Sequence, residues 1–193
     1  MEDRQIIKEL QEGSEAAFSK LVNSYQKMVV NTCFGLVHNT HDAEDIAQEV
    51  FIEVYRSVEK FRSDSRLSTW IYRIAVNKSL NYIRDNKKSR WLQNIEEVFS
   101  GKGKNSGTPE AERSSDPGAG IEDKQRAHLL HKAIDELPDK QETAFTLNKY
   151  EDLSYKEISE IMELSLSSVE SLIHRAKLNL QKKLYTCYKK KCI

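Results

Sequence analysis

The stretch that decides the fold begins at Asp152, reads DLSYKEISEIM to Met162, and resumes with SSVESLIHRAK from Ser167 to Lys177. Apolar residues recur at intervals of three and four in both halves, which is the period of an amphipathic helix. Ser-x-x-Glu patterns start at Ser154 and Ser167 and predict a capping box at each helix N-terminus. Because only residues 163–166 separate the halves, the helices must cross steeply to bury their apolar stripes together. The pattern predicts a helix-turn-helix, whose second helix can enter a major groove.

The composition indicates a chain with enough apolar residues for two modest cores. The 193 residues are 38% hydrophobic and 31% charged, and apolar residues recur at three and four rather than two. No apolar run approaches the length of a membrane span, and the residues after Met1 do not begin a signal peptide, so we expect no membrane protein. Three irregularly spaced cysteines fit a reducing cytoplasm rather than a disulfide framework.

The chain is expected to be all-α, with two small helical domains joined by a flexible linker. Five of the seven glycines and two of the three prolines lie between residues 101 and 120, a stretch too polar to bury a core. The expected division is residues 1–92, a linker at 93–123, a domain at 124–186 and a basic, cysteine-containing tail at 187–193. The expected helices are Arg4–Glu12, Ser14–Val37, Asp42–Phe61, Ser68–Arg90, Lys124–Leu137, Asp139–Asn148 and the helix-turn-helix.

Charge is segregated along the chain although the net charge is zero. Residues 42–54 hold five acids and no Lys or Arg, whereas residues 56–90 hold ten Lys or Arg against three acids. Residues 171–193 hold seven Lys or Arg and no acid. The segregation predicts two kinds of partner, a basic protein surface and a polyphosphate.

The acidic segment forms a stripe on its helix. Asp42, Asp45, Glu49 and Glu53 recur at spacings of three and four beside the apolar face, with Gln48 among them. Like charges at this spacing repel by a few tenths of a kcal/mol per pair. A solvated helix face is the ordinary explanation, but no Lys or Arg of this segment offsets the repulsion. We therefore favour a docking surface for a basic partner.

The next helix carries the opposite pattern. A stripe of basic and amide side chains contains Arg73, Asn77, Asn81, Arg84 and Lys88. Arg and Asn are suited to bridging phosphates and base edges, and Asn is a poor choice for a purely structural helix face. The interleaved aromatic residues Trp70, Tyr72 and Tyr82 either stack on unpaired bases or belong to the core.

The second helix of the helix-turn-helix presents polar side chains opposite its apolar stripe. These candidate DNA contacts are Ser168, Glu170, Ser171, His174, Arg175 and Lys177. Glu170 either caps the helix, which we favour, or accepts a hydrogen bond from a cytosine amine. Arg175 and the pair Lys182 and Lys183 are expected to contact phosphates or bases.

The sequence offers no catalytic constellation and no phosphate-binding glycine loop. Cys187 and Cys192 with His174 would make part of a zinc or redox site, but no second ligand pair accompanies them, so we favour spare thiols. His38 and His41 flank a helix junction and are interpreted as turn residues. We expect no enzyme, no cofactor and no metal.

Two long blocks of the chain resemble bacterial sigma factors. DAEDIAQEVFIEVYR from Asp42, followed by FRSDSRLSTWIYRIAVN from Phe61, is similar to their second conserved region. LPDKQ from Leu137, together with the helix-turn-helix, is similar to their fourth region. With only a linker between them, the chain resembles the small extracytoplasmic-function (ECF) group.

The resemblance implies a specificity subunit of RNA polymerase that selects promoters and helps to melt them. Asp42, Asp45, Gln48, Glu49 and Glu53 would bind core polymerase. The minus-ten element would contact Phe61, Arg62, Ser63, Asp64, Arg73, Asn77, Lys78, Asn81 and Arg84. The minus-thirty-five element would contact Ser168, Glu170, Ser171, His174, Arg175 and Lys177. Members often carry a basic residue where Glu142 and Glu170 stand, which leaves the base preference open. An anti-sigma factor is the expected inhibitor, and the free chain is expected to be a monomer.

The alternative is a stand-alone helix-turn-helix transcription regulator. That alternative explains the second domain, but it leaves the acidic helix and the Asn/Arg stripe without a role. A regulator would bind duplex DNA without polymerase, whereas a sigma factor of this type would bind promoter DNA weakly until core polymerase joins it. The promoter sequence, the inducing signal and the relative orientation of the two domains are left open.

Overall fold

A computed structural model describes residues 2–61, 65–99 and 129–189. No strand occurs in those residues, which confirms the expected all-α class. The helices are α1 (Glu2–Gln11), α2 (Glu15–Val37), α3 (Thr40–Ser57), the short 3₁₀ helix η1 (Val58–Lys60), α4 (Leu67–Phe99), α6 (Asp139–Lys149), α7 (Tyr155–Met162) and α8 (Leu166–Lys189). Residues 129–135 are also helical and precede α6.

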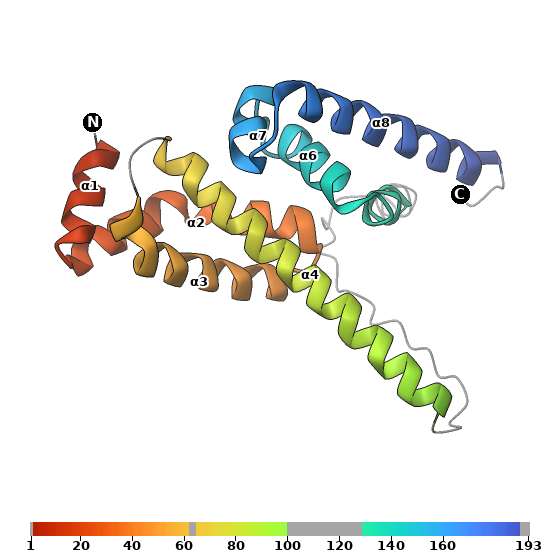
Figure 1. The fold of residues 1–193 in the computed structure, drawn as a ribbon, viewed down its shortest axis with the longest axis horizontal. Coiled ribbons are helices and arrows are strands. Elements are labelled where there is room, and N and C mark those ends of the chain that lie inside the picture. The colour runs from red at the N-terminus through yellow and green to blue at the C-terminus, as the bar shows by residue number, and fades with distance from the viewer. Residues whose placement is uncertain (1, 62–64, 100–128, 190–193) are drawn as a thin grey trace, which may run out of the picture.

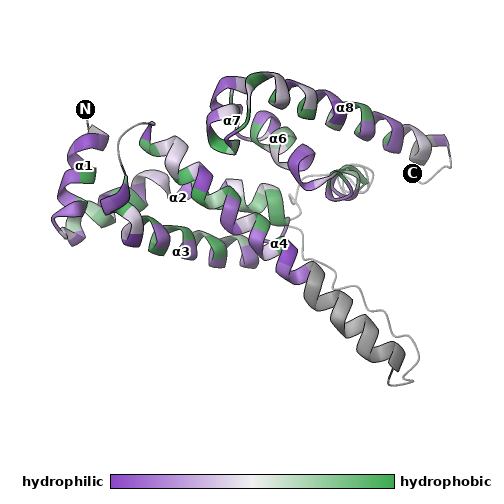
Figure 2. Cartoon of the chain, in the orientation of Figure 1, coloured by the Kyte–Doolittle hydropathy of each residue, from purple (hydrophilic) through white to green (hydrophobic). Residues whose placement is uncertain are grey.

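The N-terminal domain packs α1, α2, α3 and the first half of α4 around one core (Figure 1). Its fully buried side chains include Leu21, Val29, Val50, Val54 and Ile71. They come from the apolar faces of α2, α3 and α4, as the three- and four-residue periodicity requires. Figure 2 shows hydrophobic and hydrophilic residues alternating along α3, the pattern of a helix with one buried face.

The ends of these helices follow from local chemistry. Gly13 has φ of +82° after α1, and the backbone N–H of Ser14 donates to the Glu9 carbonyl, as in a glycine-terminated helix. The Ser14 hydroxyl oxygen then caps α2 by accepting from Ala17 N. Asn39 caps α3 in the same way, through Asp42 N. Polar residues in the short connections therefore set where each helix begins.

The C-terminal domain consists of residues 129–135, α6, α7 and α8. Ser154 and Glu157 form the predicted capping box at the start of α7. The second predicted box is wrong, because α8 begins at Leu166 and the Ser165 hydroxyl oxygen accepts from Ser168 N at 3.2 Å. Glu170 is therefore one turn inside the helix and exposed, and the capping role predicted for it is wrong.

The two domains pack against each other, which fixes the orientation that the sequence left open. Buried Leu36, Tyr72 and Val76 of the N-terminal domain share one cluster with Leu147 and Ile158 of the C-terminal domain. In Figure 1, α6 and α7 lie over α2 and the first half of α4, and the far end of α4 extends away from both domains. The helix α4 continues to Phe99, so residues 93–99, expected in the linker, are helical. The rest of that linker lies outside the described residues.

Candidate nucleic-acid interface and polymerase-docking surface

The predicted acidic stripe lies along α3. Asp45, Gln48 and Glu49 are exposed, and Asp42 and Glu53 are partly exposed. Their apolar neighbours Ile46, Ala47, Val50 and Val54 are buried, so packing of the helix directs the stripe outward. Exposed Ile52 and Tyr55 add apolar area to the same helix. The stripe therefore combines negative charge with accessible apolar side chains.

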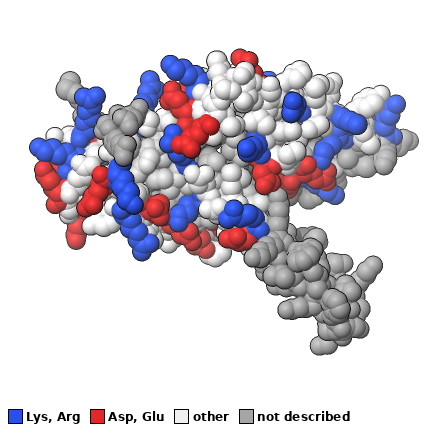
Figure 3. Space-filling view, in the orientation of Figure 1, with Lys and Arg blue, Asp and Glu red and all other residues white. Residues whose placement is uncertain are grey.

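A lysine from α4 does reach the acidic stripe, contrary to the expectation from α3 alone. Lys78 of α4 places Nζ 3.5 Å from Glu49 Oε2 and 3.8 Å from Glu53 Oε2, and His41 lies 3.8 Å from Asp45. Lys78, predicted as a DNA contact, is thus directed toward the acids in this structure. Figure 3 shows acidic and basic side chains side by side over this face of the molecule.

The polar stripe on α4 divides into an open part and a covered part. Asn77, Asn81 and Arg84 are exposed. Arg73 is partly covered by α7 and the residue after it: its guanidinium donates to the Glu160 carbonyl oxygen at 2.8 Å and lies 2.8 Å from Glu163 Oε1. The side chain of Lys88 and residues 62–64, which include Arg62, Ser63 and Asp64, lie outside what the structure describes.

The aromatic residues of this region are packing residues here. Phe61 is 9% exposed and its ring lies 4.9 Å from that of Trp70. Tyr72 is buried and donates a hydrogen bond to Glu151 at 3.0 Å, across the contact between the domains. Burial, with Glu151 nearby, raises the pKa of Tyr72 well above its ordinary value. Tyr72 is therefore a core residue here, whereas Trp70 and Tyr82 are partly buried and pack against the edge of the N-terminal core.

The second helix of the helix-turn-helix presents its predicted residues to solvent. The buried face of α8 consists of Val169, Ile173, Ala176 and Leu180. Opposite them, Glu170, Ser171, His174, Arg175 and Lys177 are exposed, and Ser168 is partly exposed. Their helical spacing puts them on one continuous polar surface without competing intramolecular ion pairs among the described residues. This surface has the form of a major-groove reader.

A cluster at the domain contact was missed by sequence reasoning. His38 has φ of 54° at the end of α2, so the turn role predicted for it is confirmed, whereas the same prediction for His41 is wrong, because His41 lies in the first turn of α3. However, its Nε2 also lies 2.9 Å from Asp135 Oδ1 of the other domain. The two residues are so far apart in sequence that no local pattern relates them.

Known protein families match the two domains separately. Residues 21–89 match the family described as Sigma-70 region 2, and residues 127–180 match Sigma-70, region 4. The RNA polymerase sigma-H factor of Pseudomonas aeruginosa is 34% identical over 187 residues, which cover 95% of this chain and 94% of that protein. The ECF RNA polymerase sigma factor SigW of Bacillus subtilis is 32% identical, with 92% and 94% covered.

Solved structures share the fold. CnrH, in complex with the cytosolic domain of CnrY, has a TM-score of 0.66 and 18% identity, covering 96% of this chain and 99% of that one. The sigma factor RpoE of Bartonella quintana, in complex with the anti-sigma factor NepR, has a TM-score of 0.60 and 21% identity, covering 87% and 96%.

Two helical domains, one with an acidic stripe on α3 and one with a helix-turn-helix, define the class of two-domain transcription factors. Within that class the chain belongs to the sigma-70 family, in its ECF group. None of the described helices has the length and apolar character needed to cross a membrane.

Proposed function

We propose that this chain directs core RNA polymerase to specific promoters and helps to open the minus-ten element. The observation that carries the proposal is the presence of three distinct surfaces. These are the acidic stripe on α3, the Asn/Arg stripe on α4 and the polar surface of α8. A stand-alone regulator needs only the last of these. Polymerase would perform the chemistry, and this chain would contribute recognition alone.

The acidic stripe would dock on a basic surface of core polymerase. The residues proposed for this docking are Asp42, Asp45, Gln48, Glu49 and Glu53. Charge complementarity accelerates encounter and selects the partner more than it adds affinity. The exposed side chains of Ile52 and Tyr55 supply the apolar contact that a stable interface also needs.

The stripe on α4 would hold the unpaired strand of the minus-ten element. Asn77, Asn81 and Arg84 are accessible for this role, and Lys78 would reach DNA after leaving Glu49 and Glu53. Extruding a base costs a few kcal/mol, which binding in a pocket and stacking offset. Phe61, Arg62, Ser63 and Asp64, which precede α4 in the sequence, are proposed as further contacts to the minus-ten element.

The surface of α8 would read the minus-thirty-five element in duplex form. Ser168, Glu170, Ser171, His174, Arg175 and Lys177 are proposed as its contacts. Arg175 is the residue best suited to a bidentate contact with guanine, while Lys177 is suited to phosphate.

The packing of the two domains against each other, called here the closed arrangement, suggests how DNA recognition is restrained. Arg73 is held by α7, so the domains have to separate before this guanidinium reaches DNA. Core polymerase would favour the open state by binding it more tightly. An anti-sigma factor would do the reverse by covering the docking surfaces. In this proposal the chain is a monomer when it is free of its partners.

Run-off transcription on fragmented genomic DNA of the source organism tests the function. Discrete transcripts are expected only when core polymerase and this chain are both present. If no transcript appears while the chain alone retards specific duplexes, it acts instead as a stand-alone regulator.

A further inference from the structure

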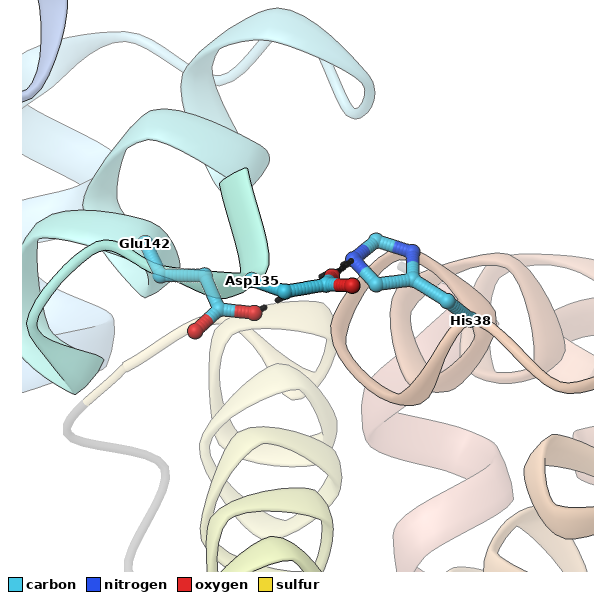
Figure 4. Close-up of side chains that lie close together, drawn as sticks. All are labelled: His38, Asp135 and Glu142. Carbon is cyan, nitrogen blue, oxygen red and sulfur yellow. Dashed lines mark ion pairs between the residues drawn. The ribbon is translucent and has the colours of Figure 1, made fainter. Parts of the chain in front are cut away.

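His38, Asp135 and Glu142 meet where the two domains touch, and none of the surfaces described above uses them (Figure 4). His38 ends α2 in the N-terminal domain, whereas Asp135 and Glu142 stand on either side of Pro138 in the C-terminal domain. His38 Nε2 lies 2.9 Å from Asp135 Oδ1 and 4.0 Å from Glu142 Oε1. Figure 4 shows the Asp135 carboxylate between the other two side chains.

The His38 side chain is only 9% exposed and is directed at these carboxylates. Although Nε2 lies 2.9 Å from Asp135 Oδ1, neither ring nitrogen makes a hydrogen bond to any residue that the structure describes. A buried polar atom without a hydrogen bond destabilises the folded state. The ring nitrogen facing the carboxylates would regain this energy by binding a cation held among them.

The donor atoms suit a transition-metal ion. One atom from each residue lies within 4.8 Å of the others. Tetrahedral Zn²⁺ with bonds of about 2.0–2.2 Å holds its ligand atoms roughly 3.3–3.5 Å apart. The observed separations of 2.9 and 4.0 Å bracket that spacing, so small side-chain rotations would complete the geometry.

The residue types narrow the choice of ion. An imidazole nitrogen beside carboxylates favours Zn²⁺ and similar ions over Mg²⁺ or Ca²⁺, which prefer oxygen ligands. The ring of His131 packs edge-on against that of His38, with centroids 5.1 Å apart, but His131 is not among the residues whose ligand atoms lie within 4.8 Å of one another.

We propose that His38, Asp135 and Glu142 bind one divalent transition-metal ion of the Zn²⁺ type, which joins the two domains. Because the ligands come from both domains, the ion binds the closed arrangement more tightly than the open one. Binding and closure are therefore linked in both directions: the ion stabilises closure, and separation of the domains releases the ion. The inference concerns the free chain and holds whether or not the chain directs polymerase.

Zn²⁺ binding to the full chain tests the site, with Cys187→Ser and Cys192→Ser present so that tail thiols do not compete. A chromophoric chelator reports affinity and stoichiometry, and thermal unfolding reports stabilisation. We expect one Zn²⁺ per chain, a higher Tm than in EDTA, and no effect of Mg²⁺. His38→Asn, which tolerates the positive φ, and Glu142→Gln should each weaken binding by about tenfold or more, as loss of groups supporting a metal does.

His41→Ala is the matched control, because His41 sits at the same helix junction with a side chain 83% exposed, outside the cluster. It should bind Zn²⁺ as the parent chain does. Unchanged affinity in His38→Asn and Glu142→Gln would overturn the proposal, and so would absence of Zn²⁺ binding in the parent chain. If His38→Asn does not fold, the test rests on two other measurements. Glu142→Gln must weaken Zn²⁺ binding, and the NMR signal of His38 Nε2 in the parent chain must shift on Zn²⁺ addition.

Discussion

Gly35 of α2 and Thr146 of α6 approach so closely that a Cβ atom on Gly35 would lie 2.8 Å from Thr146 Cγ2. That separation is shorter than any ordinary van der Waals contact, and Thr146 is fully buried. The absence of a side chain at residue 35 is therefore what lets the two domains come together here.

Gly35→Ala should open the chain while stabilising the N-terminal domain. The new methyl group overlaps Thr146, and forcing extra atoms into a packed site costs about 1–3 kcal/mol. Within α2 itself, alanine is favoured over glycine by about 1 kcal/mol. Small-angle X-ray scattering should show a larger radius of gyration. Adding Thr146→Ser removes Cγ2 and should restore the compact form; a compact Gly35→Ala single variant would contradict this account.

Glu163→Lys should increase affinity for single-stranded minus-ten DNA by about two- to fivefold. The ion pair with Arg73 is partly exposed and contributes up to about 1 kcal/mol, which the variant removes. Fluorescence anisotropy with a labelled oligonucleotide measures the effect. Glu160→Lys makes the same charge change nearby, yet Arg73 contacts only the backbone oxygen of Glu160. Equal gains in both variants would mean a general charge effect rather than release of Arg73.

Asp45→Arg combined with Glu49→Arg should abolish binding to core polymerase and leave the fold intact. Both side chains are exposed, and the lost contact of Glu49 with Lys78 is a surface pair worth no more than about 1 kcal/mol. Co-elution with core polymerase and circular dichroism measure the two expectations. Glu44→Arg, an exposed acid of α3 outside the stripe, should still bind. Normal affinity in the double variant would remove the stripe from the mechanism.

Arg175→Ala should weaken recognition of the minus-thirty-five duplex by about 1–3 kcal/mol and relax its sequence preference. Lys177→Ala provides the comparison, because a phosphate contact weakens binding uniformly and lowers the salt slope by about 1. Binding to a panel of duplexes at several salt concentrations separates the two effects. An unchanged preference in Arg175→Ala would assign Arg175 to structure.

Glu151→Gln should stabilise the chain near pH 7.5, with a gain that fades in acid. Burial raises the pKa of Glu151, despite the hydrogen bond from Tyr72, which acts the other way. The folded state therefore carries a penalty for the charged form above this pKa, and the penalty disappears as the pH falls through it toward the unfolded value. The amide oxygen of Gln still accepts from Tyr72. Urea unfolding at pH 7.5 and pH values near 4.5 measures the difference.

Glu157→Gln should have the opposite effect on stability and destabilise the chain near pH 7.5. Hydrogen bonds from Ser154 lower the pKa of Glu157, so its charged form contributes stability above the unfolded pKa. That contribution is lost as the pH falls through the lowered pKa. Glu157→Gln should thus be less stable than the parent chain at pH 7.5, and a gain in stability there would refute the capping explanation.

The sequence predicted most of the helices because their signals are local. Ser14, the Ser154–Glu157 pair and Pro138 act within one or two helical turns, and the apolar periodicity of α3 and α8 needs no partner to be recognised. The second capping box failed because the serines at 165, 167 and 168 compete, and Ser165, two residues before the predicted cap Ser167, accepts from the backbone instead. The candidate surfaces on α3 and α8 followed from the same periodicity.

By itself, the sequence determined the helices, the two domains and the side chains that each helix presents, because these depend on residues within a few turns of one another. Only the tertiary structure decided that the domains close, that Arg73 lies under α7 and Lys78 turns to the acidic stripe, and that His38 meets Asp135. These contacts join residues far apart in the chain, and their formation depends on shape, as at Gly35 and Thr146, which no periodic pattern records.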